Sequence, residues 1–228
     1  LFFGLIGMAY YLQRERAALL EAELKTRELQ HTEAERRGLE AQLKMLQAQI
    51  EPHFLFNTLA NLAGLIEADP KLASRLLEAL NRYLRASLQR TRAEGGTLGD
   101  EIDLLTAYLD VLKIRLGQRL DFAFAVPEAL RALPFPPMLL QPLVENAIRH
   151  GIEPKVEGGR IDIAAAQDAA GLRLMIGDTG AGFGDAPGNG IGLTNIRARL
   201  EALYGPTAGL EVSEQAGGGV LATLHIPT

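Results

Sequence analysis

The hydrophobic pattern of this 228-residue chain changes near Gly117, and that change limits the folds available to it. Before Gly117, apolar residues recur three and four positions apart, as in amphipathic helices. After it, Phe122, Phe124 and Val126 alternate with smaller or charged residues, as in a half-buried strand. The pattern predicts a helical region followed by an α+β domain at residues 120–228, with helices on one face of a mixed or antiparallel sheet.

Composition and charge exclude several kinds of partner and cofactor. The net charge is −5 and the pI about 5.5, and the sequence has no basic stripe, which argues against a nucleic-acid partner. Without cysteine, the chain has no disulfide, no thiolate nucleophile and no cysteine-ligated zinc. The histidines, which do not stand at metal-ligand spacing, are His31, His53, His150 and His225. A histidine-ligated metalloenzyme is therefore not expected.

Residues 1–12 are uncharged and mostly apolar, and Arg14 and Arg16 follow them. Because a transmembrane helix needs about 20 apolar residues, this run cannot cross a bilayer alone. A buried core helix or a signal-peptide fragment is the ordinary interpretation. The paired tyrosines and the cationic flank favour instead the cytoplasmic end of a truncated transmembrane helix, with a sensor region upstream.

Residues 13–48 are predicted to form a coiled-coil linker. They contain one glycine and no proline, and a seam of positions recurs at steps of three and four. The seam comprises Leu29, Thr32, Arg36, Leu39, Leu43, Leu46 and Ile50. Only the half from Leu39 onward is apolar enough to pack firmly. A parallel dimeric coiled coil is favoured over a single solvated helix.

Residues 49–119 are predicted to be a helical dimerisation domain. Asp69-Pro70 separates its first two helices, residues 93–97 form a loop, and a third helix covers residues 99–115. The apolar faces of these helices are too broad to be buried by single helices. Packing against a second copy, in an antiparallel helical bundle and hence a homodimer, is expected.

A proline-histidine pair stands inside what otherwise reads as one long helix. A proline within a helix costs roughly 3 kcal/mol, because it removes a donor and clashes with the preceding turn. Pro52 is in such a place, directly before His53, and Asn57 lies four residues on and on the same face. A kink beside an imidazole is typical of a chemical position.

Two glycine-rich loops occur close together in the second domain. The first, Asp178-Thr179-Gly180-Ala181-Gly182, follows an apolar strand. A carboxylate at a strand end can accept a hydrogen bond from an exocyclic amine such as that of adenine, and glycines let the backbone approach a flat ring. This loop is therefore a candidate site for a nucleobase.

The second loop, Gly188-Asn189-Gly190-Ile191-Gly192-Leu193, opens a predicted helix. Free amide donors and the positive end of a helix dipole suit phosphate oxygens. Turn glycines alone explain most runs of this kind. The loop comes late and follows no parallel βαβ series, so it does not fit a Rossmann fingerprint.

The predicted helix over residues 138–150 supplies a third element. Glu145 and Asn146 are adjacent polar residues in an apolar stretch, and Arg149 and His150 follow one turn later. A magnesium ion on a nucleotide takes one or two protein oxygens, of which Asn146 can supply one. Arg149 or His150 can meet phosphate charge. A surface helix end with ordinary polar residues is the alternative for this helix taken alone.

Three motifs together resemble the N, G1 and G2 boxes of the GHKL ATP-binding fold, namely Glu145-Asn146, Asp178-x-Gly-x-Gly182 and Gly190-x-Gly192. Joined to Gln49–Asn57, they are similar to the LytS-type sensor histidine kinases over about residues 42–228. The most specific segments are Pro52–Asn57 and Leu140–Ala147. The resemblance implies a helical phosphotransfer domain followed by an ATP-binding domain.

That resemblance implies that His53 accepts a phosphoryl group from ATP, that Asn146 ligates magnesium and that Asp178 contacts adenine. Gly190 and Gly192 would line the phosphate-binding loop. It further implies a two-component signalling protein, whose response regulator receives the phosphoryl group on an aspartate. The chain would then be the cytoplasmic portion of a bacterial inner (plasma) membrane protein.

The group that activates the imidazole is left open by the sequence. The residue after His53 is Phe54, where many histidine kinases carry an acidic residue. A neutral imidazole is nucleophilic at pH 7 and needs only modest activation. Either Glu51 or Glu145 can orient or deprotonate it. Asn57 either positions a water that hydrolyses phosphohistidine or is an ordinary surface amide.

The prediction is thus a membrane-tethered, homodimeric sensor histidine kinase that uses ATP and Mg²⁺. Two alternatives share the nucleotide fold: a serine/threonine kinase, and a nonenzymatic dimeric scaffold that binds nucleotide without transferring phosphate. Neither alternative needs His53.

Overall fold

The computed structural model describes residues 52–92, 95–182 and 191–227. The predicted membrane segment and coiled-coil linker lie outside this range, as do Glu51 and Gly190 of the candidate site. Over the described ranges, no helix is both long enough and apolar enough to cross a bilayer.

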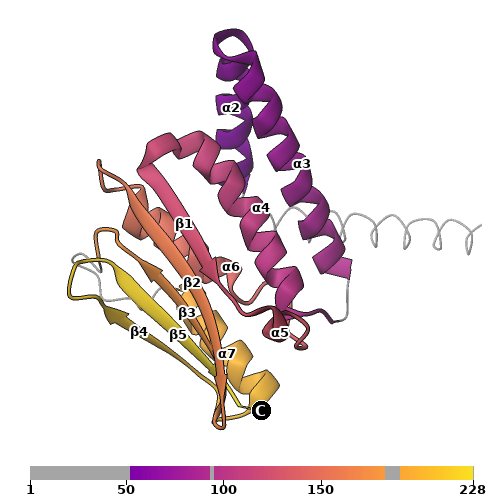
Figure 1. Ribbon diagram of the computed structural model, residues 1–228, viewed down its shortest axis with the longest axis vertical. Helices are drawn as coiled ribbons and strands as arrows, with labels where there is room; N and C mark the ends of the chain where they lie inside the picture. Colours follow the sequence, from indigo (N-terminus) through magenta and orange to yellow (C-terminus); the bar gives the residue numbers. More distant parts are fainter. Residues whose placement is uncertain (1–51, 93–94, 183–190, 228) are drawn as a thin grey trace, which may run out of the picture. The chain divides into compact units, whose positions relative to one another are not determined.

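Three helices open this part of the chain (Figure 1): α2 (Pro52–Ala68), α3 (Pro70–Arg92) and α4 (Leu98–Leu116). The predicted break between the first two is confirmed. Asp69 lies between them, and its carboxylate accepts the Leu72 amide at 3.0 Å, which satisfies one free donor at the start of α3. The structure also confirms the third predicted helix.

An aromatic cluster joins the three helices. Phe54 of α2, Tyr83 of α3 and Tyr108 of α4 are each at most 3% exposed. The ring centroids are 5.3 Å apart for Phe54 and Tyr83, 4.9 Å for Phe54 and Tyr108, and 5.5 Å for the two tyrosines. Such pairs contribute about 0.5–1.5 kcal/mol beyond burial. The cluster therefore fixes the first turn of α2 against α3 and α4.

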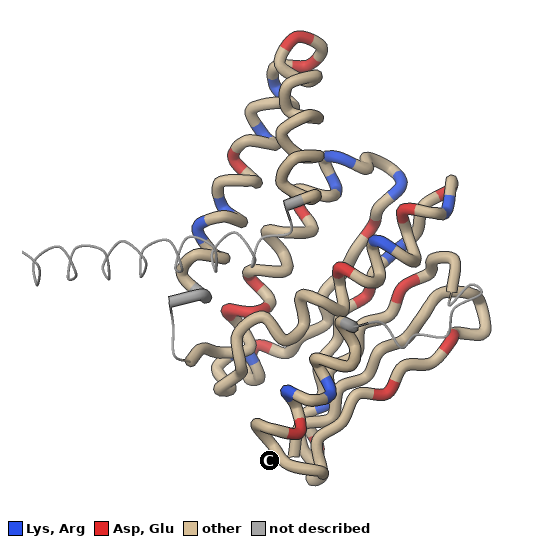
Figure 2. The backbone as a smooth tube through the Cα atoms, turned by 180° about the vertical axis from the view of Figure 1, so that it is seen from behind, with Lys and Arg blue, Asp and Glu red and all other residues tan. Residues whose placement is uncertain are grey.

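Opposite charges are interspersed along the surface of the helices (Figure 2). Arg82 of α3, for example, pairs with Asp110 of α4 at 3.1 Å. The two side chains are 60% and 38% exposed, and solvent-exposed pairs of this kind contribute about 1 kcal/mol or less. The buried aromatic cluster, more than these surface pairs, holds the helices together.

Five strands follow α4 and form one mixed sheet. They are β1 (Leu120–Ala125), β2 (Gly159–Asp168), β3 (Gly171–Asp178), β4 (Gly209–Glu214) and β5 (Val220–Ile226). Their order is β1-β2-β3-β5-β4, with β1 and β2 parallel and the other neighbours antiparallel. The predicted fold class, a helical region followed by an α+β domain, is confirmed.

Helices follow and separate the strands: α5 (Glu128–Arg131), α6 (Gln141–Asn146), the π-helical turn η2 (Ala147–Ile152) and α7 (Ile191–Tyr204). Figure 1 shows α6 and α7 on the same face of the sheet. Alternate strand residues are buried, for instance Ile161 and Ile163 on either side of exposed Asp162. The period-2 pattern seen in the sequence thus records which face of the sheet is covered.

The helix predicted over residues 138–150 is wrong at its start. α6 begins at Gln141. Met138 has a left-handed φ of 56°, which a helix cannot include. The Glu101 carboxylate, fully buried in α4, accepts the amides of Met138 and Leu140 at 2.8 and 3.0 Å. A distant charge therefore holds these residues in a non-helical turn.

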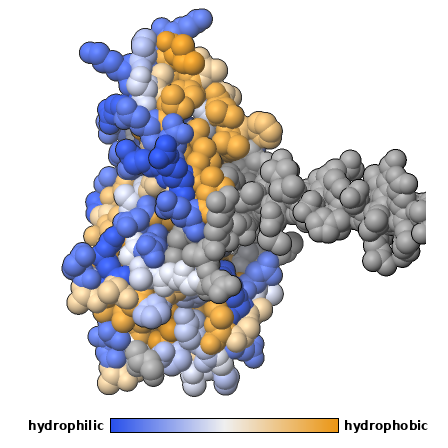
Figure 3. All heavy atoms as spheres, turned by 90° about the vertical axis from the view of Figure 1, so that its right-hand side faces the viewer, coloured by the Kyte–Doolittle hydropathy of each residue, from blue (hydrophilic) through white to orange (hydrophobic). Residues whose placement is uncertain are grey.

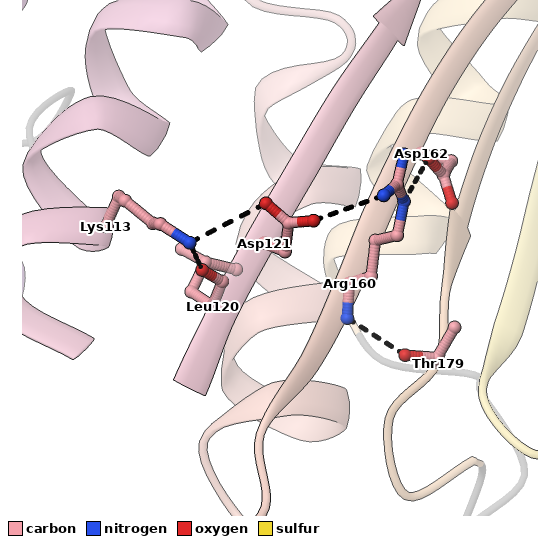
Figure 4. A network of polar contacts seen from close by, with 6 residues as sticks. All are labelled: Lys113, Leu120, Asp121, Arg160, Asp162 and Thr179. Atoms are coloured by element: carbon pink, nitrogen blue, oxygen red, sulfur yellow. Dashed lines mark hydrogen bonds and ion pairs between the residues drawn. The ribbon is translucent and has the colours of Figure 1, made fainter. Parts of the chain in front are cut away.

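A polar network ties the end of α4 to the sheet (Figure 4). Lys113 of α4 donates to the Leu120 carbonyl and pairs with Asp121 at 3.6 Å. Asp121 pairs at 3.1 Å with Arg160, its neighbour on β2, and Arg160 pairs with Asp162 at 2.8 Å. These pairs are exposed and contribute little stability each. Their effect is to align α4, β1 and β2.

Candidate functional site

His53 lies in the first turn of α2, and its side chain is exposed. Pro52 is the first residue of α2 that the structure describes. The predicted kink also requires a helix before Pro52, and those residues lie outside the described range. The imidazole is therefore accessible from solvent.

Asn57 lies one turn on and contacts the His53 ring. Its Nδ2 is 3.0 Å from Nε2 and 3.4 Å from Nδ1. An amide N–H that bonds Nε2 needs the lone pair of that nitrogen, which leaves the ring proton on Nδ1. In the reversed amide, the Asn57 oxygen would accept a hydrogen bond from Nε2–H, and the lone pair would be on Nδ1. In either orientation, Asn57 selects one tautomer of the ring.

Phe54, the residue after His53, belongs to the buried aromatic cluster. It is 3% exposed and packs edge-on against Tyr83. A carboxylate at this position would lose its hydration in an apolar surrounding. The group that activates the imidazole must therefore come from another position. Of the two predicted carboxylates, Glu145 is described and Glu51 is not.

Asp178 ends β3 as a buried carboxylate. Its Oδ1 accepts the Gly180 amide at 2.8 Å, and its Oδ2 accepts the Val220 amide at 3.2 Å. Burial raises the pKa of this carboxyl, while these two hydrogen bonds and the charge of Lys155 lower it. A carboxylate offers about four acceptor positions, so two backbone bonds leave capacity for a further donor. An exocyclic amine fits that requirement.

Three glycines let the backbone close around Asp178. A Cβ on Gly151 would lie 2.6 Å from the Asp178 Oδ1, and one on Gly219 would lie 1.9 Å from its carbonyl oxygen. A Cβ on Gly180 would lie 2.3 Å from Gly151, and Gly182 completes the loop at a φ of 77°. No larger residue fits these three contacts. Gly180 and Gly182 stand in the predicted first glycine-rich loop, whereas Gly151 and Gly219 were not predicted.

The loop after Asp178 is fixed from two sides. The Arg160 amide donates to the Thr179 hydroxyl at 2.9 Å, as drawn in Figure 4, and the Thr179 amide donates to the Arg160 carbonyl at 3.0 Å. Lys155 donates to the Thr179 carbonyl at 2.8 Å. Hydrogen bonds thus attach the candidate nucleobase site to the beginning of β2.

The structure brings Asn146 and Gly192 together, although 46 positions separate them in the sequence. A Cβ on Gly192 would lie 3.7 Å from the Asn146 Nδ2, so the first turn of α7 begins beside this amide. Leu193, 7% exposed, anchors that turn in the core. A phosphate chain lying at the start of α7 would therefore be within reach of Asn146, which suits an oxygen ligand to a nucleotide-bound magnesium.

Arg149 and His150 are exposed and lie in the π-helical turn η2. The Glu153 amide bonds to the Ile148 carbonyl at 2.9 Å, five residues back. Such π-turns are frequent at functional sites. The predicted helix over residues 138–150 is therefore π-helical, not α-helical, where Arg149 and His150 lie.

The architecture and these motifs define a class of protein, the histidine kinases, and residues 41–120 match the family model described as Histidine kinase. The chain is 36% identical over 190 residues to the sensor histidine kinase BtsS of Escherichia coli K12, which covers 82% of this chain and 34% of that protein. It is 30% identical over 235 residues to the sensor protein LytS of Bacillus subtilis, covering 97% of this chain and 38% of that protein.

The chain belongs to the family of sensor histidine kinases that includes LytS and BtsS. The resemblance seen in the sequence is confirmed. The chain spans about a third of the length of the curated relatives it matches. A solved histidine kinase domain from Erythrobacter litoralis EL346 aligns with 84% of this chain and 93% of that one, at a TM-score of 0.48 and 18% identity.

Proposed function

We propose that this chain is the kinase portion of a two-component sensor, which binds ATP at the Asp178 end of the sheet and phosphorylates its own His53. The observation that carries the proposal is the Asp178 carboxylate, buried, enclosed by three glycines and able to accept a further donor. Membership of the sensor histidine kinase family supports it.

The proposed organisation follows the pattern of the sequence. Residues 1–12 end a membrane helix, 13–48 form the coiled-coil linker, 49–119 dimerise and carry the phosphate, and 120–228 bind ATP. The chain would then lie on the cytoplasmic side of a bacterial inner membrane. A response regulator would receive the phosphoryl group on an aspartate.

The chemical step needs one lone pair and one proton acceptor. The unprotonated ring nitrogen of His53 attacks the γ-phosphorus of ATP, the N–P bond forms, the bond to the bridging oxygen breaks, and ADP leaves with the electron pair. The phosphorylated ring is cationic until its other nitrogen gives up a proton to Glu51 or Glu145. Asn57, which contacts Nε2, selects which ring nitrogen carries the proton. Positioning supplies most of the rate, as phosphoryl transfer generally requires.

Magnesium fits the residues around the start of α7. Asn146 would supply one oxygen, while Gly190, Gly192 and Leu193 would line the phosphates, and Arg149 or His150 would meet their charge. Over the described residues, no three His, Asp, Glu or Cys side chains gather into a metal site. A nucleotide-bound magnesium needs only one or two protein oxygens, because phosphates and waters complete its shell. The ion neutralises phosphate charge when bound.

An exposed apolar face on the helices supports the proposed homodimer (Figure 3). Its largest members are Phe56, Leu59, Ile66, Leu77 and Leu88, with exposed fractions of 70%, 45%, 58%, 47% and 39%. A monomer rarely leaves this many large apolar side chains in water on neighbouring helices. A second copy that packs α2 and α3 against the same helices would bury them.

Labelling with γ-labelled ATP tests the proposal. We expect the wild type to acquire label that is labile in acid and stable in base, as a phosphoimidazole is. His53→Gln should abolish it, and His225→Gln, a histidine of β5, is the matched control that should keep it. Base-labile label that survives His53→Gln would indicate serine phosphorylation. Nucleotide binding without any label would indicate a scaffold.

A further inference from the structure

Gln141 occupies a position between the helical region and the candidate site. It opens α6 and is 2% exposed. Its Nε2 donates to the Tyr83 hydroxyl at 3.1 Å and to the Glu145 Oε1 at 2.7 Å. Both hydrogens of the amide are therefore engaged, one by a residue of α3 and the other by a residue one turn further along α6.

The buried amide keeps these two bonds at a cost. Its Oε1 has no hydrogen-bond partner among the residues that the structure describes. A buried acceptor left in this way is unfavourable, whereas a leucine of similar size would carry no such penalty. The two donated bonds are the chemical contribution that distinguishes glutamine from an apolar side chain at this place.

Tyr83 is itself held by the helix that carries His53. Its ring packs edge-on against Phe54, the residue next to His53, and is 1% exposed. A displacement of the first turn of α2 therefore moves Phe54 against Tyr83 and shifts the hydroxyl that Gln141 contacts. Phe54, the residue after His53, thus contacts Tyr83, which in turn contacts Gln141.

The backbone just before α6 is attached to α4. Glu101 accepts the amides of Met138 and Leu140, immediately before Gln141. These two bonds attach the backbone before Gln141 to α4 without involving α2. The side-chain amide, rather than the backbone, is then the part that responds to Tyr83.

We propose that Gln141 is a positioning residue that couples the helix carrying His53 to Glu145. The contacts run from Phe54 through Tyr83 and Gln141 to Glu145, which precedes the candidate magnesium ligand Asn146. Glu145 is directed correctly only while α2 and α3 are packed as described. The inference rests on the proposed kinase function, and it adds a route by which a movement of α2 changes the rate of phosphoryl transfer.

Tyr83→Phe tests the series with the smallest change, because the ring and its contact with Phe54 remain and only the hydroxyl is lost. Tyr108→Phe is the matched control: it removes a hydroxyl from the same aromatic cluster and leaves the Tyr83–Gln141 bond in place. We expect Tyr83→Phe to lower the autophosphorylation rate constant at saturating ATP about three- to tenfold, as loss of one hydrogen bond allows. The Kd for ADP should stay within about twofold.

A double variant decides whether Tyr83 acts through Gln141. Because the two residues share one route, Tyr83→Phe combined with Gln141→Leu should be no slower than Gln141→Leu alone. Thermal melts of all four variants identify any general loss of structure, which would raise the Kd for ADP together with the loss of rate.

Three results would overturn the inference. A Tyr83→Phe protein that labels as fast as Tyr108→Phe removes the role of the hydroxyl. Multiplicative losses in the double variant show that the residues act independently, and a parallel loss of ADP affinity and rate indicates a purely structural role. All three require a wild type that labels on His53. A wild type without label refutes the proposed function itself, and this inference with it.

Discussion

The two chemical positions of this chain are held in opposite ways. Asp178 is 3% exposed, with both carboxylate oxygens bonded to backbone amides and glycines closing around it. His53 is exposed, and its ring contacts the side chain of Asn57. A site that recognises one small molecule gains from a fixed surface. The proposed role of His53, a nucleophile that meets ATP and then a second protein, requires access from solvent.

The largest effect is expected where the fixed site is tightest. Gly219 has a φ of 87°, and a Cβ there would lie 1.9 Å from the Asp178 carbonyl oxygen. We expect Gly219→Ala to lower the free energy of unfolding by about 3 kcal/mol or more, measured by urea denaturation. Gly217→Ala is the matched control, because nothing lies within 4 Å of its Cβ position. Equal stability of the two variants would show that the enclosure of Asp178 is not rigid.

The next largest effect is expected on α2, the helix that carries the exposed His53. Phe56 lies on α2, is 70% exposed and belongs to the apolar face assigned to the dimer. Phe56→Asp should weaken the dimer about 30-fold or more, as sedimentation equilibrium would measure, because a charge cannot be buried there unpaired. Val156→Asp introduces the same charge at an 81% exposed valine in the turn before β2 and should leave association unchanged. If both variants dissociate alike, the apolar face is not the interface.

A smaller effect is expected at the His53 ring. Asn57→Ala removes the amide that selects the tautomer and should slow autophosphorylation about two- to tenfold, with little change in the urea midpoint. Asn81→Ala, an exposed asparagine of α3, serves as the control. An Asn57→Ala protein that labels at the wild-type rate would mean that the ring needs no fixed tautomer.

The smallest effect is a dependence of stability on pH at Asp178. Burial raises the pKa of this carboxyl in the folded state. Its contribution to stability is therefore fully present below the unfolded pKa and is lost as pH rises through the folded pKa. Relative to Asp178→Asn, the wild type should lose stability between acid and neutral pH, as urea unfolding across that range would show. The series repeated on Asp162→Asn corrects for one lost charge, and a constant difference for Asp178 contradicts the expectation.

Local patterns in the sequence predict most of the fold. The break at Asp69, the third helix and the change of period after Gly117 follow from periodicity and turn chemistry over a few residues, and the structure agrees. The helix predicted from Met138 fails because its cause is not local. A carboxylate 37 residues away, on Glu101, captures the amides that a helix would use.

The residues of the candidate site likewise include some that a local motif predicts and some that only the fold brings together. Asp178 and Gly192 stand in recognisable motifs, whereas Gly151 and Gly219 matter only because the fold brings them to Asp178. A run of three glycines before β5 is the one signal that could have drawn attention to Gly219. No local sequence pattern predicts the hydrogen bond between Tyr83 and Gln141, because that bond depends on how α3 packs beside α6.

Mass spectrometry of the chain after incubation with Mg²⁺ and ATP, under conditions that preserve phosphoimidazole, tests the central claim most directly. The account predicts one phosphate on the peptide that contains His53 in the wild type and in Asp162→Asn, and at least tenfold less in Asp178→Asn, which loses the carboxylate acceptor for adenine. Phosphate on a different residue, or equal phosphorylation of His53 in Asp178→Asn, would contradict it.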